Sequence, residues 1–212
     1  GTVVMSVTAV IMLVYVGQRS ARHEVDKRGA LRNHFTLMPV AFTLLSPLGA
    51  IAFRTLRPYG VSQAVIKAGH AAVMCTASVI AIMGVMYIID SHQNLIHEEQ
   101  ASVGEVHLES AHSWIGVWAC SLFVINSLAA PFVFYNPYAS PAFRAAFLPL
   151  HVFVGLVAVL LTILSVPMGI LAWVWRGTHE AYTDDPYPKG GSQMSLEYKT
   201  SALLISLQLV FM

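Results

Sequence analysis

Four of the nine histidines lie near the ends of long apolar runs, where their imidazoles could ligate a metal-containing cofactor. His34 and His112 each open an apolar run just after a polar loop, whereas His70 and His151 each lie a few residues into a run. If successive runs cross a membrane in alternating directions, His34 and His112 share one face, and His70 and His151 share the other. Two pairs of imidazoles at matched depths are what two haems, each with one histidine on either side of its iron, would require.

The alternative for each histidine is a structural role, because a single helical imidazole is commonly packed and bonded to a backbone carbonyl. A charged group at the middle of a bilayer costs about 2.5–3.5 kcal/mol on insertion scales, and a neutral imidazole still needs partners for its ring nitrogens. Iron ligation by one nitrogen and a hydrogen bond to the other supply those partners. Gly116 and Gly155 each follow a histidine by four residues, so they either make room for a flat ring or allow close helix contact. As a set of four, the histidines favour haem.

The elements that must position these histidines are membrane helices. The 212 residues are 56% hydrophobic and 11% charged, whereas soluble chains are about 25% charged. A transmembrane helix needs about 20 apolar residues to cross about 30 Å of hydrocarbon. We expect one domain, 1–212, that is an all-α integral membrane bundle of six helices. The expected spans are 1–17, 34–56, 65–89, 111–135, 146–175 and 198–212.

The two cysteines, Cys75 and Cys120, both lie inside apolar runs and indicate no disulfide framework. There is no C-x-x-C-H motif for covalent attachment, so the predicted haems are of the non-covalent b type. The sequence has no P-loop, no glycine-rich dinucleotide motif and no short repeat, and we expect no nucleic-acid partner.

The charges are distributed unequally between the two predicted membrane faces. We call side A the face with the loops at 18–33, 90–109 and 176–200, and side B the face with the loops at 56–64 and 136–147. Side A has all 11 acidic residues and 8 of the 12 basic ones. Side B has basic residues only, namely Arg54, Arg57, Lys67 and Arg144. The count of Lys and Arg alone would place side A in the cytosol.

The four histidine segments together resemble the cytochrome b561 family. They read RNHFTLM, IKAGHAAVM, ESAHSWIG and AFLPLH, in that order on consecutive spans. The family pattern has a histidine followed four residues later by Met, then K-x-x-H, S-x-H-S-W-x-G and Pro-x-His. The resemblance covers roughly 33–174, and H-S-W-x-G is its most specific part. Arg54 and Arg144 also match, and so does the SHQN segment that contains His92.

Three features depart from the family pattern. Phe35 stands where a proline is usual, and Met74 replaces a second histidine on the third span. The loop between the third and fourth spans is longer and more acidic than usual, which affects the expected recognition of an acceptor. None of these departures removes a haem ligand.

The resemblance implies a four-helix core holding two b haems. It also implies that ascorbate donates electrons on the cytosolic side and that ferric complexes or monodehydroascorbate accept them on the other side. It implies a cytosolic side B, against the count of basic residues. His70 and His151 would then hold the cytosolic haem, and His34 and His112 the non-cytosolic haem. The remaining expected site residues are Arg54 for the cofactor, Lys67, Arg144 and Arg57 for ascorbate or haem propionates, and His92, His107 and Glu109 for the acceptor.

Two other functions remain open from the sequence. One is a quinone-linked haem b subunit of a larger redox complex, and the other is a haem-free transporter that uses membrane histidines as a relay. The resemblance favours the ascorbate-dependent oxidoreductase, in the plasma membrane or an endomembrane vesicle. A homodimer is left open.

Overall fold

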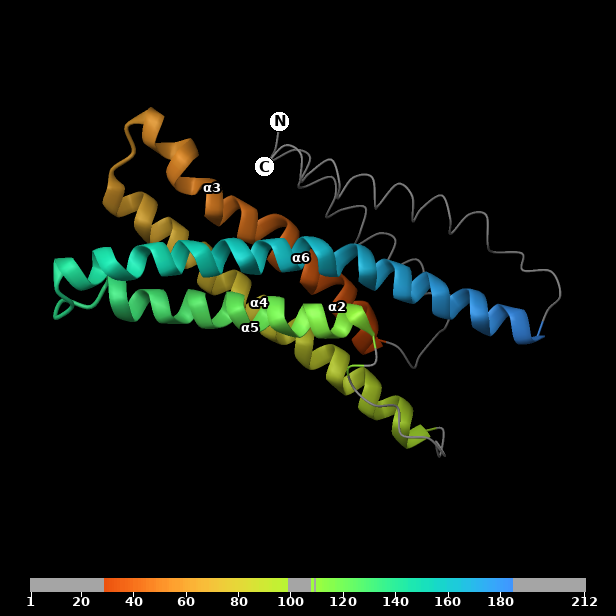
Figure 1. Cartoon of the computed structure of the whole chain (residues 1–212). Helices are drawn as coiled ribbons and strands as arrows, with labels where there is room; N and C mark the ends of the chain where they lie inside the picture. The colour runs from red at the N-terminus through yellow and green to blue at the C-terminus, as the bar shows by residue number, and fades with distance from the viewer. Residues whose placement is uncertain (1–28, 99–107, 109, 185–212) are drawn as a thin grey trace.

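The computed structural model describes residues 29–98, 108 and 110–184, and every element in this part of the chain is a helix (Figure 1). The predicted spans 1–17 and 198–212 lie outside the described residues. The elements are α2 (Gly29–Pro39), the π-helix η1 (Val40–Leu45), α3 (Ser46–Leu56), the 3-10 helix η2 (Arg57–Tyr59), α4 (Gln63–Glu98), α5 (Ala111–Phe134) and α6 (Pro141–Asp184).

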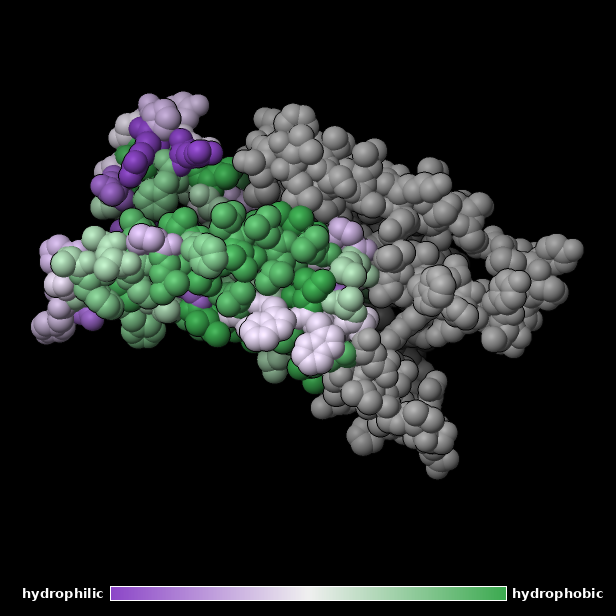
Figure 2. Space-filling model, viewed as in Figure 1, coloured by the Kyte–Doolittle hydropathy of each residue, from purple (hydrophilic) through white to green (hydrophobic). Residues whose placement is uncertain are grey.

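Four described helical segments are long and apolar enough, by length and composition, to cross a membrane. They are Asn33–Tyr59, Gln63–Asp90, Ala111–Phe134 and Pro141–Gly169. Large apolar side chains on α4, α5 and α6 are exposed, for example Phe132 and Leu156. The face seen in Figure 2 is accordingly hydrophobic along the described helices and hydrophilic mainly where α3 turns into α4. This outward apolar surface is typical of helices that face lipid.

The helix ends follow from local sequence. Ser110 is the N-cap of α5, and its hydroxyl oxygen accepts a hydrogen bond of 3.2 Å from the Ser113 amide. Its position places His112 in the first turn of the helix. The turn between α3 and α4 contains Gly60, whose φ of 73° is in the left-handed region that favours glycine. This turn reverses the chain within a few residues.

The span formed by α2, η1 and α3 contains a widened π turn. At its end the amide of Ser46 donates to the carbonyl of Ala41, five residues back, instead of four as in an α-helix. Pro47 follows directly and has no amide hydrogen with which to continue the α-helical ladder. The π turn therefore adds one residue to this span without adding a turn.

The described helices pack as two antiparallel pairs. The α2–η1–α3 span packs along α4, α5 packs along α6, and α4 contacts α5 (Figure 1). The pairs α2 with α5 and α4 with α6 make at most slight backbone contact. Where α2 faces α5 and where α4 faces α6, the two helix pairs therefore meet mainly through side chains.

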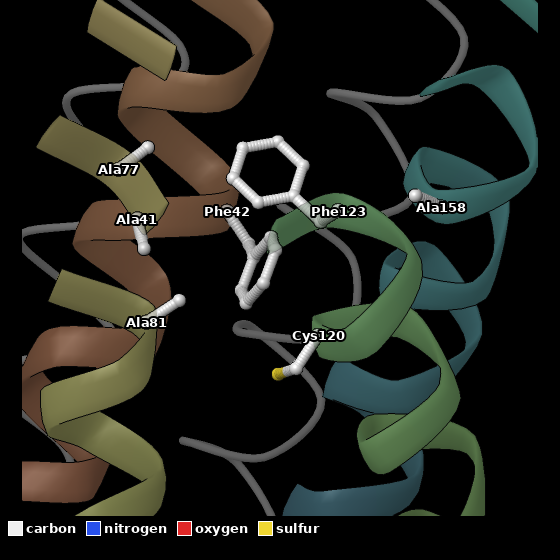
Figure 3. Close-up of a cluster of buried hydrophobic side chains, with 7 residues drawn as sticks. All are labelled: Ala41, Phe42, Ala77, Ala81, Cys120, Phe123 and Ala158. Atoms are coloured by element: carbon white, nitrogen blue, oxygen red, sulfur yellow. The ribbon is translucent and has the colours of Figure 1, made fainter. Parts of the chain in front are cut away.

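The core lies at mid-depth, between the two helix pairs. Ala41, Ala77 and Ala158 are fully buried and allow close helix approach. Phe42 and Phe123 reach toward each other across the interior, with ring centroids 5.1 Å apart (Figure 3). Small residues within each pair and two aromatic rings between the pairs make up this apolar centre.

Candidate haem sites

The structure brings the four transmembrane histidines together as two pairs. The ring centroids of His34 and His112 are 6.3 Å apart, and their planes are inclined by 83°. The ring centroids of His70 and His151 are 6.4 Å apart, with an inclination of 82°. The members of each pair come from the helices that otherwise make little contact, α2 with α5 and α4 with α6. The two sites thus have almost the same geometry.

These distances fit two imidazoles on opposite sides of one metal ion. A nitrogen–metal bond of about 2.0 Å, followed by about 1.1 Å to the ring centre, puts two in-line ring centres about 6.2 Å apart. Among the described residues there is no group of three or more His, Cys, Asp or Glu side chains that could hold a bare metal ion. A haem needs only two protein ligands, because its porphyrin supplies the other four nitrogens. The histidine pairs therefore fit haem better than a simple metal site.

In the first helix pair, each histidine is held by a main-chain carbonyl of the neighbouring helix. Nδ1 of His34 donates to the carbonyl of Gly84 at 2.9 Å, and Nδ1 of His70 donates to the carbonyl of Gly49 at 2.8 Å. A carbonyl can only accept, so the proton lies on Nδ1. The basic nitrogen for a metal is then Nε2, on the other side of the ring.

In the second helix pair, α5 and α6 hold each other's histidine. Nδ1 of His112 donates to the carbonyl of Ser165 at 2.8 Å, and the Ser165 hydroxyl also lies 3.2 Å from this nitrogen. Nδ1 of His151 is 3.0 Å from Oδ1 of Asn126. Asn126 also donates from Nδ2 to the carbonyl of residue 151 at 3.1 Å, which orients its amide oxygen toward the imidazole. All four rings are thus oriented by a hydrogen bond at Nδ1.

The histidines and their partners lie in register at two depths of the bundle. Each helix carries one histidine, followed further along by the group that holds the histidine of its neighbour. The same interval separates His70 from Gly84, His112 from Asn126 and His151 from Ser165, whereas the interval from His34 to Gly49 is longer by a single position. The common interval is close to four helical turns, a rise of about 21 Å, which separates the two sites along the bundle. The π-helix η1 accommodates the additional residue of the first span.

Methionines and glycines form matched contacts in the first helix pair. A Cβ atom at Gly84 would lie 2.7 Å from Sδ of Met38, and one at Gly49 would lie 3.0 Å from Cε of Met74. Each methionine follows the histidine of its helix by four residues and so lies on the same face. At both positions the absence of a side chain lets a methionine pack closely against the helix. The carbonyl of the same glycine accepts the hydrogen bond from a histidine.

Gly116 and Gly155 have an equivalent role in the second pair. A Cβ at Gly116 would lie 3.3 Å from Oγ of Ser165, and one at Gly155 would lie 3.3 Å from Nδ2 of Asn126. From the sequence, these glycines were expected either to make room for a flat ring or to allow close helix contact. The structure shows close helix contact at both. Each glycine makes room for the residue that holds the histidine one turn away.

Two basic residues of side B, Arg57 and Lys67, are each separated from the His70–His151 pair by one aromatic ring. The ring of Phe53 is 5.5 Å from that of His70, and the ring of Phe134 is 5.4 Å from that of His151. The guanidinium of Arg57 is 6.0 Å from the centre of the Phe53 ring. The basic end of the bundle is therefore continuous with this histidine pair.

Lys67 and Arg144 both bind the turn between α5 and α6. Nζ of Lys67 donates to the carbonyl of Phe134 at 2.8 Å and lies 4.8 Å from the ring centre of Tyr135. Nη2 of Arg144 donates to the carbonyl of Asn136 at 2.7 Å. Positive charge at the C-terminus of a helix is favourable, because its last carbonyls lack helical partners. Both side chains therefore have a structural role, whatever else they bind.

The Nε atom of Arg144 is buried and has no hydrogen-bond partner among the described residues. A buried hydrogen-bond donor without a partner costs free energy. This atom therefore indicates a site where a bound group accepts a hydrogen bond. Arg54 and Arg57 are exposed at the same end of the bundle. His92 lies in the last turns of α4, but its side chain is outside the described part of the chain, as are His107 and Glu109.

Several residues that position the histidines were missed from the sequence. They include Asn126 and Ser165, and also Gly169, where a Cβ would lie 2.6 Å from the His112 ring. A usable signal was present, because a small or polar residue follows each histidine at a nearly constant interval, close to four helical turns. Only the helix pairing shows which histidine each one serves.

Comparison with known protein families matches residues 33–176 to eukaryotic cytochrome b561. The chain is 30% identical over 138 residues to the plasma membrane ascorbate-dependent reductase of Mus musculus, across 65% of this chain and 44% of that protein. It is 29% identical over 137 residues to the lysosomal membrane ascorbate-dependent ferrireductase of Bos taurus, across 65% and 49% respectively. It is 26% identical over 149 residues to the probable ascorbate-specific transmembrane electron transporter 2 of Oryza sativa subsp. japonica, across 70% and 59%.

The chain spans about half the length of these relatives. The matched region, 33–176, is more than half of this chain and contains both histidine pairs with their hydrogen-bond partners. This chain belongs to the eukaryotic cytochrome b561 family.

Proposed function

We propose that this chain is a transmembrane oxidoreductase that transfers electrons from ascorbate, through two b haems, to ferric complexes or monodehydroascorbate. The observation that carries the proposal is the presence of two histidine pairs with centroid separations of 6.3 and 6.4 Å. When bound between such a pair, haem supplies a one-electron Fe²⁺/Fe³⁺ couple. His34 with His112 would hold one haem, and His70 with His151 the other.

The proposed donor site is the basic end of the bundle on side B. Lys67, Arg144 and the exposed Arg57 would attract the ascorbate anion, while Arg54 would pair with a haem propionate. The Nε–H of Arg144 has no partner within the described part of the chain and can donate a hydrogen bond, which supports an anion there. Phe53 and Phe134 bring this end into contact with the His70–His151 pair. Side B would then face the cytosol.

The proposed acceptor site is at the other end, near the loop between α4 and α5. His92, His107 and Glu109 would bind a ferric complex, because Fe³⁺ favours oxygen and imidazole ligands. The Bos taurus relative is a ferrireductase, which supports iron as the electron acceptor. The descriptions of the relatives also support a plasma membrane or lysosomal location for the whole protein.

Optical spectroscopy of the purified protein tests the proposal. A pyridine haemochrome assay should give two haems per chain, and ascorbate followed by a ferric chelate should reduce and then reoxidise them. A protein without haem would favour a transporter, and haem that only a quinol reduces would favour a quinone-linked subunit.

Single substitutions test which haem receives the electron. His70→Ala should abolish fast reduction by ascorbate while retaining one haem at His34 and His112. His34→Ala should retain a haem that ascorbate still reduces. The opposite result would reverse the assignment of donor and acceptor sides.

A further inference from the structure

One of the four histidines differs from the others in how its Nδ1 is held. Among the described residues, His34, His70 and His112 each donate to a main-chain carbonyl, with distances of 2.8–2.9 Å. His151 instead donates to the side-chain oxygen of Asn126. The carbonyl partners are fixed by the backbone of a helix, whereas an amide side chain can be exchanged by substitution.

Asn126 contacts residue 151 at two points. Its Oδ1 accepts from the imidazole at 3.0 Å, and its Nδ2 donates to the carbonyl of His151 at 3.1 Å. This second bond fixes the direction of the amide, so that the oxygen cannot turn away from the ring. Gly155 completes the arrangement, because a Cβ there would lie 3.3 Å from Nδ2. Asn126 and Gly155 together determine both the rotation of the His151 ring and the acceptor strength that its Nδ1–H experiences.

We propose that Asn126 is a positioning residue that sets the reduction potential of the haem held by His70 and His151, by means of its hydrogen bond to Nδ1 of His151. The inference rests on the proposed function, since it requires haem at this pair. A stronger acceptor at Nδ1 gives the imidazole more anionic character and makes Nε2 a stronger electron donor. A stronger donor stabilises ferric over ferrous iron and lowers the potential. At the other site both imidazoles donate to main-chain carbonyls, and the Ser165 hydroxyl, 3.2 Å from Nδ1 of His112, is the more distant acceptor. The two haems can therefore differ although their histidine pairs are nearly equal in geometry.

The test is a spectroscopic redox titration of the holoprotein in detergent, with haem stoichiometry measured on the same samples. Asn126→Asp places a carboxylate at the same position, so it should lower the potential of one haem. The expected change in the equilibrium constant for reduction is at least tenfold, which is about 59 mV for one electron. Asn126→Leu removes the acceptor and should raise the potential of that haem. Neither variant should move the potential of the second haem.

Two matched controls come from the symmetry of α5 and α6. Ser165→Ala removes a hydroxyl 3.2 Å from Nδ1 of His112 and touches nothing at His151, so the potential of the haem held by His70 and His151 should stay unchanged. Gly155→Ala should displace the Asn126 amide and raise one potential. Gly116→Ala, which has the same 3.3 Å clearance to Ser165, should leave the potential of the haem held by His70 and His151 in place.

The outcomes separate this inference from the function on which it rests. Two haems with unchanged potentials in Asn126→Asp and Gly155→Ala would overturn the role of Asn126 and leave the proposed function intact. Equal shifts of both haems would also overturn it, because they would reflect a general change in the bundle. If Asn126→Leu loses one haem and Asn126→Asp retains it, the potential of the retained haem decides: a lower potential supports the inference, and an unchanged one overturns it. A wild-type protein without haem would overturn the proposed function and this inference together.

Discussion

The two imidazole planes at each candidate site are almost perpendicular, and the hydrogen bonds at Nδ1 impose this orientation. The angles are 83° for His34 with His112 and 82° for His70 with His151. Because each Nδ1–H is directed at a fixed group of another helix, neither ring can rotate freely about its bond to a metal. The orientation is therefore a property of the protein and should persist when haem is bound.

Perpendicular imidazoles predict a specific electron paramagnetic resonance spectrum for the ferric protein. Parallel ligand planes separate the iron π orbitals and give three well-spaced low-spin features, whereas perpendicular planes leave these orbitals nearly equal in energy. We expect both haems to be low-spin, with one dominant feature at high g. A three-featured rhombic spectrum would contradict the ring orientations, and a high-spin signal would contradict ligation by two histidines.

The basic side chains of side B provide a second prediction at the scale of single residues. Lys67→Met and Arg144→Gln should each raise the KM for ascorbate. Loss of a charge-assisted hydrogen bond is worth about 1.5–3 kcal/mol, which is about tenfold to over a hundredfold. The measurement is the rate of haem reduction as a function of ascorbate concentration.

Because Lys67 also caps α5 through the carbonyl of Phe134, its replacement could act through the helix end. Lys67→Arg keeps a donor and a charge and should restore most of the affinity. Tyr138→Phe is the matched control, since this side chain is 94% exposed on the same turn. Changes below twofold in both Lys67→Met and Arg144→Gln would leave these residues with structural roles only.

At the scale of the elements, the main constraint on each span is a distance along the sequence. It runs from the histidine of that span to the residue that holds the histidine of the neighbouring helix. Three spans share one interval, and the first span exceeds it by a single position, with a π turn between His34 and Gly49. One residue turns an α-helix by about 100°, so an uncompensated insertion would move Gly49 off the face that meets His70. The π-helix η1 takes up the additional residue and so keeps Gly49 on the face that meets His70.

Deletion of a residue from the π turn tests this account. Removal of Leu44, which is half-buried, should remove the π turn and give the first span the interval that the other three spans share. We expect two haems per chain by pyridine haemochrome assay, as in the wild type. Leu160 lies between His151 and Ser165 on α6, where no π turn can compensate, so its removal should cost at least one haem. Equal haem loss in both variants would show that η1 does not maintain the register.

The cytochrome b561 family and the all-helical membrane fold could be predicted from the sequence, and the family match and the four membrane-length helices confirm them. Apolar runs and the H-S-W-x-G motif are local signals, so they need no knowledge of packing. The six-helix count, the haem number and the acceptor residues stay predictions. The partners of the histidines could not be predicted, because Gly84 or Ser165 acts through a main-chain carbonyl that every residue has. Asn126 carries a distinctive side chain, but its contact with His151 depends on which helices are neighbours.

At the scale of the whole molecule, the two sites lie about 21 Å apart along the bundle, with an apolar core between them. Phe42 and Phe123 are the large buried side chains of this core, and their rings are in contact. Among the described residues, the buried cluster around these rings contains Cys120 as its single ionisable side chain, and so offers no chain of ionisable groups for protons. We therefore expect the electron to cross without a proton, and the transfer to move net charge across the membrane.

Charge movement can be measured with the protein in sealed vesicles that contain ascorbate, with an impermeant ferric chelate outside. The chelate should be reduced only when ascorbate is inside, and His34→Ala should abolish this reduction while leaving a haem that ascorbate reduces. Each electron that leaves makes the interior more positive, and a potential of about 100 mV opposes each further charge by about 2.3 kcal/mol. The initial rate should therefore fall within the first turnovers and recover when a protonophore is added. A rate that does not respond to the protonophore would mean that a proton accompanies the electron, and the apolar core would then have to contain a proton path that the contacts among the described residues do not provide.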